Sequence, residues 1–141
     1  MSRRLAREVA FKVLFTIDVG SNDPDFALES AFGEEDLSRK NRDYVTQVVR
    51  GALNNQEEID GLIRKYLHGW ELERLSGVVR NLLRLALFEI KYREDIPSKV
   101  SINENLELAK TYHGMDSAKF INGILDKIAK RIQEDGSFIK N

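Results

Sequence analysis

Apolar residues recur three and four positions apart along almost the whole chain, and runs that alternate apolar and polar residues are nearly absent. The first spacing puts apolar side chains on one face of an α-helix, whereas alternation is typical of a half-buried strand. The pattern therefore predicts an all-α protein of about seven helices. We expect these helices at about residues 3–19, 24–33, 37–54, 57–67, 75–92, 101–113 and 116–134.

One of these segments, residues 75–92, is apolar nearly all the way round. A helix without a broad polar face is usually buried between other helices. We therefore expect residues 75–92 to form a central buried helix that two small helical bundles share. The helix should end before Pro97, because the residue that precedes a proline is disfavoured in the α region.

Capping residues support several of the helix boundaries. The Asp-Pro pair at positions 23–24 suits the N-cap and first position of a short helix. Ser101 and Glu104 have the spacing of a capping box, in which each residue satisfies the other's backbone N–H. His68 and His113 each precede a glycine at a predicted helix end, where the helix dipole favours a capping role for histidine.

Length and composition are those of one folded domain over residues 1–141. The chain is 42% hydrophobic and 32% charged, with a formal net charge of −1 at pH 7 and no cysteine. The lack of cysteine removes disulfides, thiolate nucleophiles and cysteine-based metal sites. No apolar run approaches the length of a membrane span, and the basic start has no uncharged segment like that of a secretory signal. We expect a cytoplasmic protein.

No catalytic or metal-binding constellation is recognisable in the sequence. The two histidines have neither of the spacings that zinc peptidases and di-iron bundles use, and glycine-rich phosphate loops are absent. The acidic run at residues 34–36 lacks the spaced ligands of a calcium loop and is interpreted as a solvated loop. We expect no enzyme activity, no cofactor and no metal site.

Charge is distributed unevenly along the first part of the chain. Residues 3–12 contain four bases and one acid, which gives a charge of +3. Residues 18–36 contain seven acids and no base, which gives −7. This contrast indicates a local anion-binding surface on an otherwise neutral protein.

The first predicted helix carries a candidate surface for RNA. On a helical wheel, Arg4, Arg7, Phe11 and Phe15 cluster beyond one edge of the main apolar face. Aromatic rings stack on unpaired bases and arginines hold phosphates, so this combination is typical of single-stranded nucleic-acid binding. The alternative is that the two phenylalanines pack against a second helix while the arginines lie in water.

The last predicted helix has a similar arrangement. Phe120 lies about 100° from the buried stripe, and Asp116 and Lys127 are on the same side of the wheel. Lys119 lies further round, on the polar face. Because Gly123 follows one turn later, the ring of Phe120 has an open surface for a planar partner such as a base. A single exposed phenylalanine is also ordinary.

Four segments of the chain carry a recognisable combination of motifs. They are Arg3–Glu8, Leu75–Ala86, Ile96–Glu104 and Asp116–Asp126, the last of which reads DSAKFINGILD. In this order they resemble the NusB family of bacterial transcription antitermination proteins. The resemblance covers essentially the whole chain.

The resemblance implies an all-helical, non-enzymatic protein that binds RNA. NusB-like proteins pair with NusE, which is also a small-subunit ribosomal protein, and the heterodimer recognises the single-stranded boxA element of nascent RNA. Together with other Nus factors it modifies RNA polymerase, so that the polymerase reads through terminators, notably in ribosomal RNA operons. A helical protein-interaction adaptor with incidental RNA binding is the alternative function.

The resemblance also assigns residues to the RNA surface. The arginine-rich first helix of the family corresponds to Arg3, Arg4 and Arg7, and an aromatic residue on that helix, often tyrosine in relatives, corresponds to Phe15. The stacking phenylalanine of the family's last motif corresponds to Phe120. With the wheel positions, the predicted RNA-binding residues are Arg3, Arg4, Arg7, Phe11, Phe15, Asp116, Lys119, Phe120 and Lys127.

The surface for NusE is implied to lie between Glu71 and Arg80. The contacts that we predict there are Glu71, Glu73, Arg74, Val79 and Arg80. Some relatives carry a carboxylate at the position of Val79, so one salt bridge to the basic partner is lacking here, and Glu71 and Glu73 can take its place. A homodimer through the same faces is an alternative that the resemblance leaves open.

Overall fold

The computed structural model describes residues 2–135, so Met1 and residues 136–141 of the predicted domain lie outside the described residues. Within this range the chain forms seven α-helices and one 3-10 turn, with no strand, which confirms the predicted all-α fold. The elements are α1 (Arg3–Gly20), α2 (Pro24–Glu34), α3 (Arg39–Asn54), α4 (Gln56–Arg64), η1 (Leu72–Arg74), α5 (Gly77–Tyr92), α6 (Ser98–Tyr112) and α7 (Met115–Asp135).

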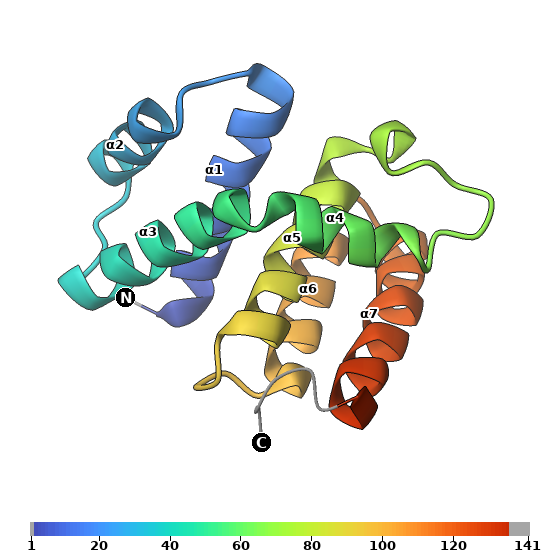
Figure 1. The fold of residues 1–141 in the computed structure, drawn as a ribbon. Coiled ribbons are helices and arrows are strands. Elements are labelled where there is room, and N and C mark those ends of the chain that lie inside the picture. Colours follow the sequence, from blue (N-terminus) through green and yellow to red (C-terminus); the bar gives the residue numbers. More distant parts are fainter. Residues whose placement is uncertain (1, 136–141) are drawn as a thin grey trace.

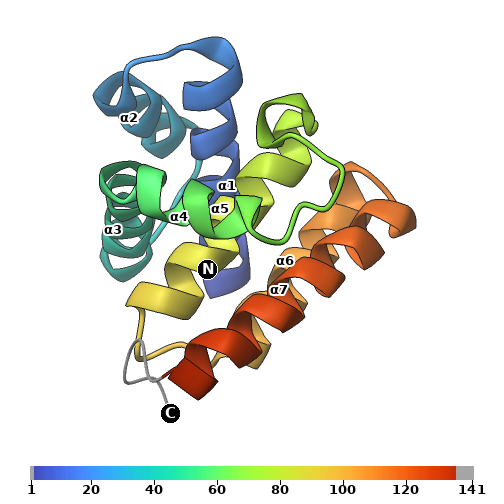
Figure 2. The same ribbon diagram turned by 45° about the vertical axis from the view of Figure 1, so that its right-hand side comes forward.

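The helices form two small bundles that share α5 (Figure 1). On one side of α5 lie α1 and α3, with α2 packed on α1. On the other side lie α6 and α7, which Figure 2 shows side by side as an antiparallel pair. Because α4 contacts both α3 and α5, it connects the two bundles.

The centre of the molecule is α5, as the sequence predicts. Every residue from Asn81 to Ile90 is buried, including the charged side chains of Arg84 and Glu89. A close approach between α3 and α5 occurs at Gly51, where a Cβ atom would lie 2.3 Å from a ring carbon of Phe88. Any larger residue at that position would have to displace this ring from the core.

Short polar side chains begin four of the helices. Ser2, Asp23, Ser38 and Ser76 each accept a hydrogen bond from the backbone N–H three residues later, at 3.1–3.2 Å. These bonds satisfy one of the orphan donors of each first turn. The predicted start of α2 at the Asp-Pro pair is thereby confirmed.

The predicted capping box is wrong. Helix α6 starts at Ser98, because the carbonyl of Pro97 already accepts hydrogen bonds from the backbone N–H groups of Val100 and Ser101, at 3.0 and 3.2 Å. Ser101 therefore lies inside the helix and is fully buried. Glu104 is directed to α1 instead, where it pairs with Arg4.

Two other helix ends also differ from the prediction. His68 caps nothing, because α4 ends at Arg64 and irregular turns follow it, whereas His113 is the C-cap of α6 as expected. After α1 the left-handed residue is Ser21, with a φ of 54°, and the glycine before it still belongs to the helix.

Candidate nucleic-acid interface

Four arginines gather at the N-terminal end of α1, and we call Arg3, Arg4, Arg7 and Arg93 the arginine cluster. The ring of Tyr44 lies among them, with the guanidinium carbons of Arg3, Arg93 and Arg7 at 4.2, 5.4 and 5.7 Å from its centroid. Arginine packs favourably over an aromatic face. Tyr44 therefore holds three positive charges of the cluster in place.

Arg7 is the buried member of the cluster, with only 3% of its surface exposed. It donates to both carboxylate oxygens of Glu89 at 3.0–3.2 Å, and the Tyr44 hydroxyl donates to the same carboxylate. Burial works to lower the pKa of the Arg7 guanidinium, but the charge of Glu89 and its hydrogen bonds raise it overall. Burial also raises the pKa of Tyr44, which stays a neutral donor. This group is a satisfied interior ion pair.

Arg4 is the exposed member of the cluster, with 70% of its side chain accessible. It makes a two-pronged pair with Glu104, at 2.9 and 2.8 Å, and a guanidinium nitrogen of Arg7 lies 3.8 Å from the same carboxylate. The hydrogen bond from Arg4 holds the pKa of Glu104 below its ordinary value. Glu104 therefore neutralises the charge that is most accessible to a phosphate.

The wheel placed Arg7 and Phe11 outside the core face, and this placement is wrong. Phe11 is 2% exposed, and its ring centroid lies 5.3 Å from that of Tyr112 and 6.3 Å from that of Phe15. Phe15 is half-buried against Gly77. Helix α6 covers this edge of α1 through Tyr112. Fewer residues of the predicted RNA surface are therefore exposed than the wheel indicated.

The candidate residues of α7 are all at least partly accessible, and of these Asp116 and Phe120 line one hollow. Asp116, Lys119 and Lys127 are exposed, and Phe120 is half-buried. Phe120 meets a residue that the sequence reasoning missed, Trp70, with ring centroids 6.0 Å apart and planes inclined at 68°. We call these two rings the aromatic corner. They border a hollow of about 320 Å³ whose wall is completed by Arg74, Leu75, Ser76, Val79, His113, Asp116 and Ser117.

Two glycines place the walls of this hollow. Gly69, with a φ of +81°, turns the chain just before Trp70, and Gly114, with a φ of +111°, turns it just before α7. Both conformations favour glycine because other residues are strained there. The sequence signal for Trp70 was its position as the lone tryptophan beside a glycine, directly before the segment predicted to bind NusE.

The predicted partner residues divide into exposed and structural groups. Glu71 pairs with Arg74 at 3.2 Å, Glu73 pairs with Arg64, and all four side chains are well exposed. Val79 is buried but lines the hollow of the aromatic corner. A partner could reach Glu71, Glu73 and Arg74 directly, because exposed ion pairs contribute little stability and are easily exchanged. It could reach Val79 only by entering the hollow.

Arg80 belongs to the structural group. Its guanidinium donates to the backbone carbonyl of Leu75 at 2.8 Å and to the Asp18 carboxylate at 2.8 Å. Longer contacts reach the carbonyls of Leu72 and Glu73. Arg80 thus ties the η1 turn, which follows Trp70, to the end of α1.

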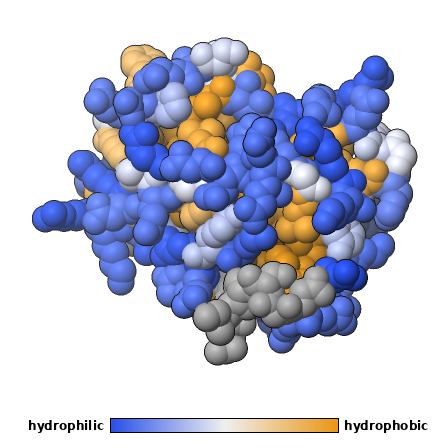
Figure 3. Space-filling view, in the orientation of Figure 1, coloured by the Kyte–Doolittle hydropathy of each residue, from blue (hydrophilic) through white to orange (hydrophobic). Residues whose placement is uncertain are grey.

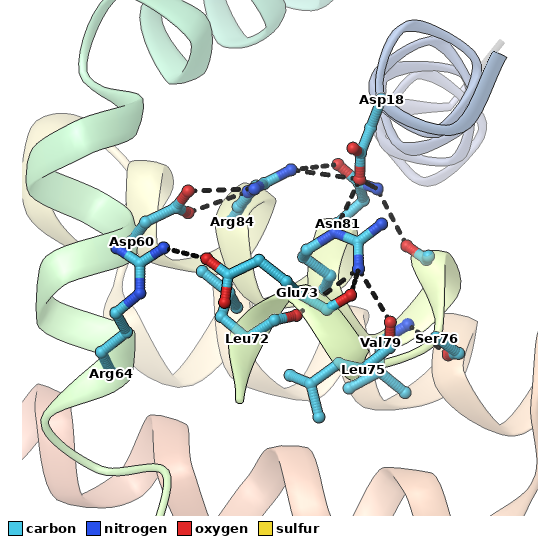
Figure 4. A network of polar contacts seen from close by, with 12 residues as sticks. Asp18, Asp60, Arg64, Leu72, Glu73, Leu75, Ser76, Val79, Asn81 and Arg84 are labelled. Atoms are coloured by element: carbon cyan, nitrogen blue, oxygen red, sulfur yellow. Dashed lines mark hydrogen bonds and ion pairs between the residues drawn. The ribbon is translucent and has the colours of Figure 1, made fainter. Parts of the chain in front are cut away.

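The same carboxylate joins α1 to a buried polar network on α5 and α4 (Figure 4). Arg84 donates to both oxygens of Asp60 at 2.9 Å and to Asp18 at 3.2 Å, and the Asn81 amide donates to Asp18 at 2.8 Å. Burial works to raise the pKa of Asp18, but Arg80, Asn81 and Arg84 lower it overall. The network fixes α1, α4, α5 and the η1 turn relative to each other.

A second hollow, of about 390 Å³, lies between α1, α2 and the ends of α5 and α6. Its apolar lining includes Phe11, Phe15, Phe26, Val78 and Tyr112. Figure 3 shows hydrophobic surface near α1 and α2, and a second hydrophobic area lower on the same face, toward α7. In residues 2–135, no helix could cross a membrane and no three acidic or histidine side chains are grouped as metal ligands would be.

Comparisons with known sequences identify relatives along most of the chain. A model of the NusB family matches residues 4–130. The chain is 48% identical over 134 residues to the transcription antitermination protein NusB of Heliobacterium modesticaldum, covering 95% of this chain and 65% of that one. It is 45% identical over 141 residues to the protein of the same name from Desulforamulus reducens, covering 100% and 99%.

Solved structures of relatives have the same fold. The structure of T. maritima NusB superimposes with a TM-score of 0.86 at 42% identity, covering 92% of each chain. A chain in the crystal structure of antitermination factors NusB and NusE in complex with dsRNA superimposes with a TM-score of 0.85 at 30% identity, covering 93% of this chain and 99% of that one.

Proposed function

The chain belongs to the NusB family, and we propose that it is a transcription antitermination factor that binds boxA RNA together with NusE. The proposed role is non-catalytic and cytoplasmic, with residues 1–141 acting as one RNA-binding unit. The complex would join other Nus factors on RNA polymerase and promote processive transcription of ribosomal RNA operons. A solved relative of this chain, described as NusB, is in a complex with NusE and dsRNA, which supports both proposed partners.

One observation carries the RNA part of the proposal. On α7, the half-buried ring of Phe120 is accompanied by the exposed cations Lys119 and Lys127. A ring that stacks on bases and cations that hold phosphates are the two components of single-strand binding. Arg3 and Arg4 add phosphate contacts at the far end of α1, with Phe15 as a further aromatic contact.

The buried residues of the predicted surface have a supporting role in this mechanism. Arg7, in its pair with Glu89, sets the position of the first turns of α1, and Phe11 packs α1 against α6. Few phosphates are neutralised by the exposed cations alone, so RNA binding by the isolated protein should be weak. NusE, bound near Glu71, Glu73 and Arg74, would strengthen binding by adding contacts of its own.

Fluorescence anisotropy of a labelled single-stranded boxA RNA tests the proposal. We expect binding that depends on sequence, strengthens with NusE and weakens steeply as salt is raised, because bound phosphates release counterions. A scrambled single-stranded RNA is the control for sequence. The boxA duplex is compared with the single strand to measure how much of the affinity requires unpaired bases, since a relative is in a complex with dsRNA. NusE binding without any RNA preference, and with little salt dependence, would instead indicate a protein-interaction adaptor and would refute the proposal.

A further inference from the structure

We propose that Trp70 is a second stacking residue for RNA, and that Trp70 and Phe120 together seat one unpaired nucleobase in the hollow between α7 and the η1 turn. This inference rests on the proposed function, since it requires that the protein bind RNA. It adds a residue that lies outside the predicted RNA surface and assigns a ligand to the hollow. It also moves Arg74 and Val79, which line the hollow, from the predicted NusE surface to the RNA site.

The geometry of the two rings suits a single base. Their planes meet at 68° with centroids 6.0 Å apart, so they form two walls of a corner rather than a closed stack. A base stacked on one ring would be met at its edge by the other ring. Both arrangements, stacked and edge-to-face, are favourable between π systems.

Trp70 is exposed in a way that packing alone does not explain. Sixty per cent of its surface is accessible, although it lies against Phe120 and beside an apolar floor of Leu75 and Val79. Among the residues that the structure describes, no group accepts a hydrogen bond from its indole N–H. A large ring with a free donor is a typical contact residue at binding surfaces.

The rim of the hollow favours a nucleobase over an aliphatic side chain. On the α7 side Asp116 supplies a carboxylate, and His113 and Ser117, whose Nδ1 and Oγ bond each other, supply further polar groups. Arg74 supplies a cation on the η1 side. A base needs these two features together, because it has an apolar face and a polar edge and is joined to phosphates. The pair between Arg74 and Glu71 is highly exposed and costs little to exchange for a phosphate.

The corner is already in place before any ligand binds. Arg80 fixes the η1 turn through the Leu75 carbonyl and Asp18, and Gly69 and Gly114 set the turns before each wall. A site that is built in advance loses little conformational entropy on binding. Trp70 should therefore contribute to affinity and not merely become ordered by the RNA.

The chain contains one tryptophan, so the emission of Trp70 can be followed directly. We expect single-stranded boxA RNA to quench this emission over the concentration range in which anisotropy reports binding. The duplex, which offers no unpaired base, should quench it much less. Trp70→Ala should weaken RNA binding on the order of tenfold, and Trp70→Phe should restore most of it, as expected for a stacking ring.

Phe32 provides a control ring, because it is partly buried on α2 and lines neither the hollow of the corner nor the hollow beside Phe15. Phe32→Ala should leave RNA affinity unchanged, and circular dichroism should show both alanine variants to be folded. If Trp70→Ala does not fold, the test rests on two other measurements, the quenching of Trp70 emission by RNA in the unmodified protein and the RNA affinity of Trp70→Phe.

Three results would overturn the inference. If RNA binds by anisotropy while Trp70 emission stays constant and Trp70→Ala binds normally, the corner is not a base site and the proposed function survives. If Trp70 emission responds only to NusE, the corner is a protein contact. If the unmodified protein shows no anisotropy change with any RNA, the proposed function itself fails and the inference fails with it.

Discussion

The arginine cluster and the aromatic corner combine the same kinds of residue, cations and aromatic rings, yet they use them differently. In the cluster, Arg7 is paired with Glu89, Arg4 with Glu104 and Arg93 with Asp95, so three of the four charges have a carboxylate partner within the protein. In the corner, Trp70 and Phe120 meet edge to face beside a hollow, and most of the Trp70 surface stays exposed.

This difference indicates that the arginine cluster serves mainly the stability of the fold and the aromatic corner mainly the binding of a ligand. Charges that are desolvated must be paired, so the cluster contributes first to the fold and offers mainly Arg4 to a ligand. Trp70 contributes little to the fold, because most of its apolar area stays in water until a partner covers it, and Phe120 contributes only through the part that packs on the core. Substitutions in the cluster should therefore act mainly on unfolding, and substitutions in the corner mainly on RNA affinity.

The largest effect is expected at the buried pair of the cluster. Glu89→Gln should lower the free energy of unfolding by about 3–5 kcal/mol, because it leaves the Arg7 charge buried without its counterion. Urea denaturation measures this loss. The double variant Arg7→Met/Glu89→Met should lose less than Glu89→Gln alone. A loss below 1 kcal/mol in the single variant would show that the cluster is not a structural unit.

The second largest loss of stability is expected at Asp18, which supports the aromatic corner through Arg80. Asp18→Asn should lower the free energy of unfolding by about 1.5–3 kcal/mol at neutral pH, because Arg80 and Arg84 lose a charged acceptor. The pKa of Asp18 in the fold lies below the ordinary 3.8, so its contribution is present above that pH and disappears as the pH falls through the lowered value.

The stabilities of the two proteins should therefore converge in buffers below pH 3.8, which urea denaturation across a pH series can follow. A difference that stays constant to the lowest pH would mean that the Asp18 charge does not stabilise the network. Asp25→Asn, at an exposed position on α2, is the matched control for the loss of one carboxylate and should lower the free energy of unfolding by less than about 1 kcal/mol at neutral pH.

A corner substitution should affect RNA and spare the fold. Phe120→Leu retains an apolar side chain but removes the π face, so it should weaken boxA binding by about 1–3 kcal/mol while urea denaturation changes little. Anisotropy of the labelled RNA measures the affinity. Normal RNA affinity in a folded variant would refute the stacking role of Phe120.

The smallest effect is expected at the exposed pair of the cluster. Glu104→Gln removes the carboxylate that competes with phosphate for Arg4, so RNA affinity should rise by about 0.2–1 kcal/mol, the range of an exposed ion pair. Glu57→Gln changes the net charge equally on α4, far from Arg4 in sequence and on another helix. If RNA affinity rises equally in the two variants, the gain comes from the change in net charge and not from the release of Arg4.

The helices and most of their starts were predictable because they depend on local signals. Apolar spacing gave seven helices, the Asp-Pro pair began α2, and the nearly uniform apolarity of residues 75–92 identified the central helix. The capping box at Ser101 was mispredicted because Pro97 offers an earlier start, and both patterns are locally plausible. Local signals could not choose between them.

The candidate surfaces were predictable only in part. The wheel identified the edge of α1 that carries Arg4 and Phe15, but it could not show that α6 covers Phe11 there or that Glu89 of α5 neutralises Arg7. Trp70 had no helical pattern to mark it, since it lies in a loop. Its significance depends on Phe120, which the fold brings from a distant helix.

The sequence by itself determined the all-helical class, the central helix and the family, because short-range spacing and local motifs encode all three. Only the tertiary structure decided which arginine is paired inside, which phenylalanine is covered and which ring Trp70 meets. These outcomes depend on residues far apart in the chain, and burial and electrostatic pairing are set where the helices pack together rather than along any one of them.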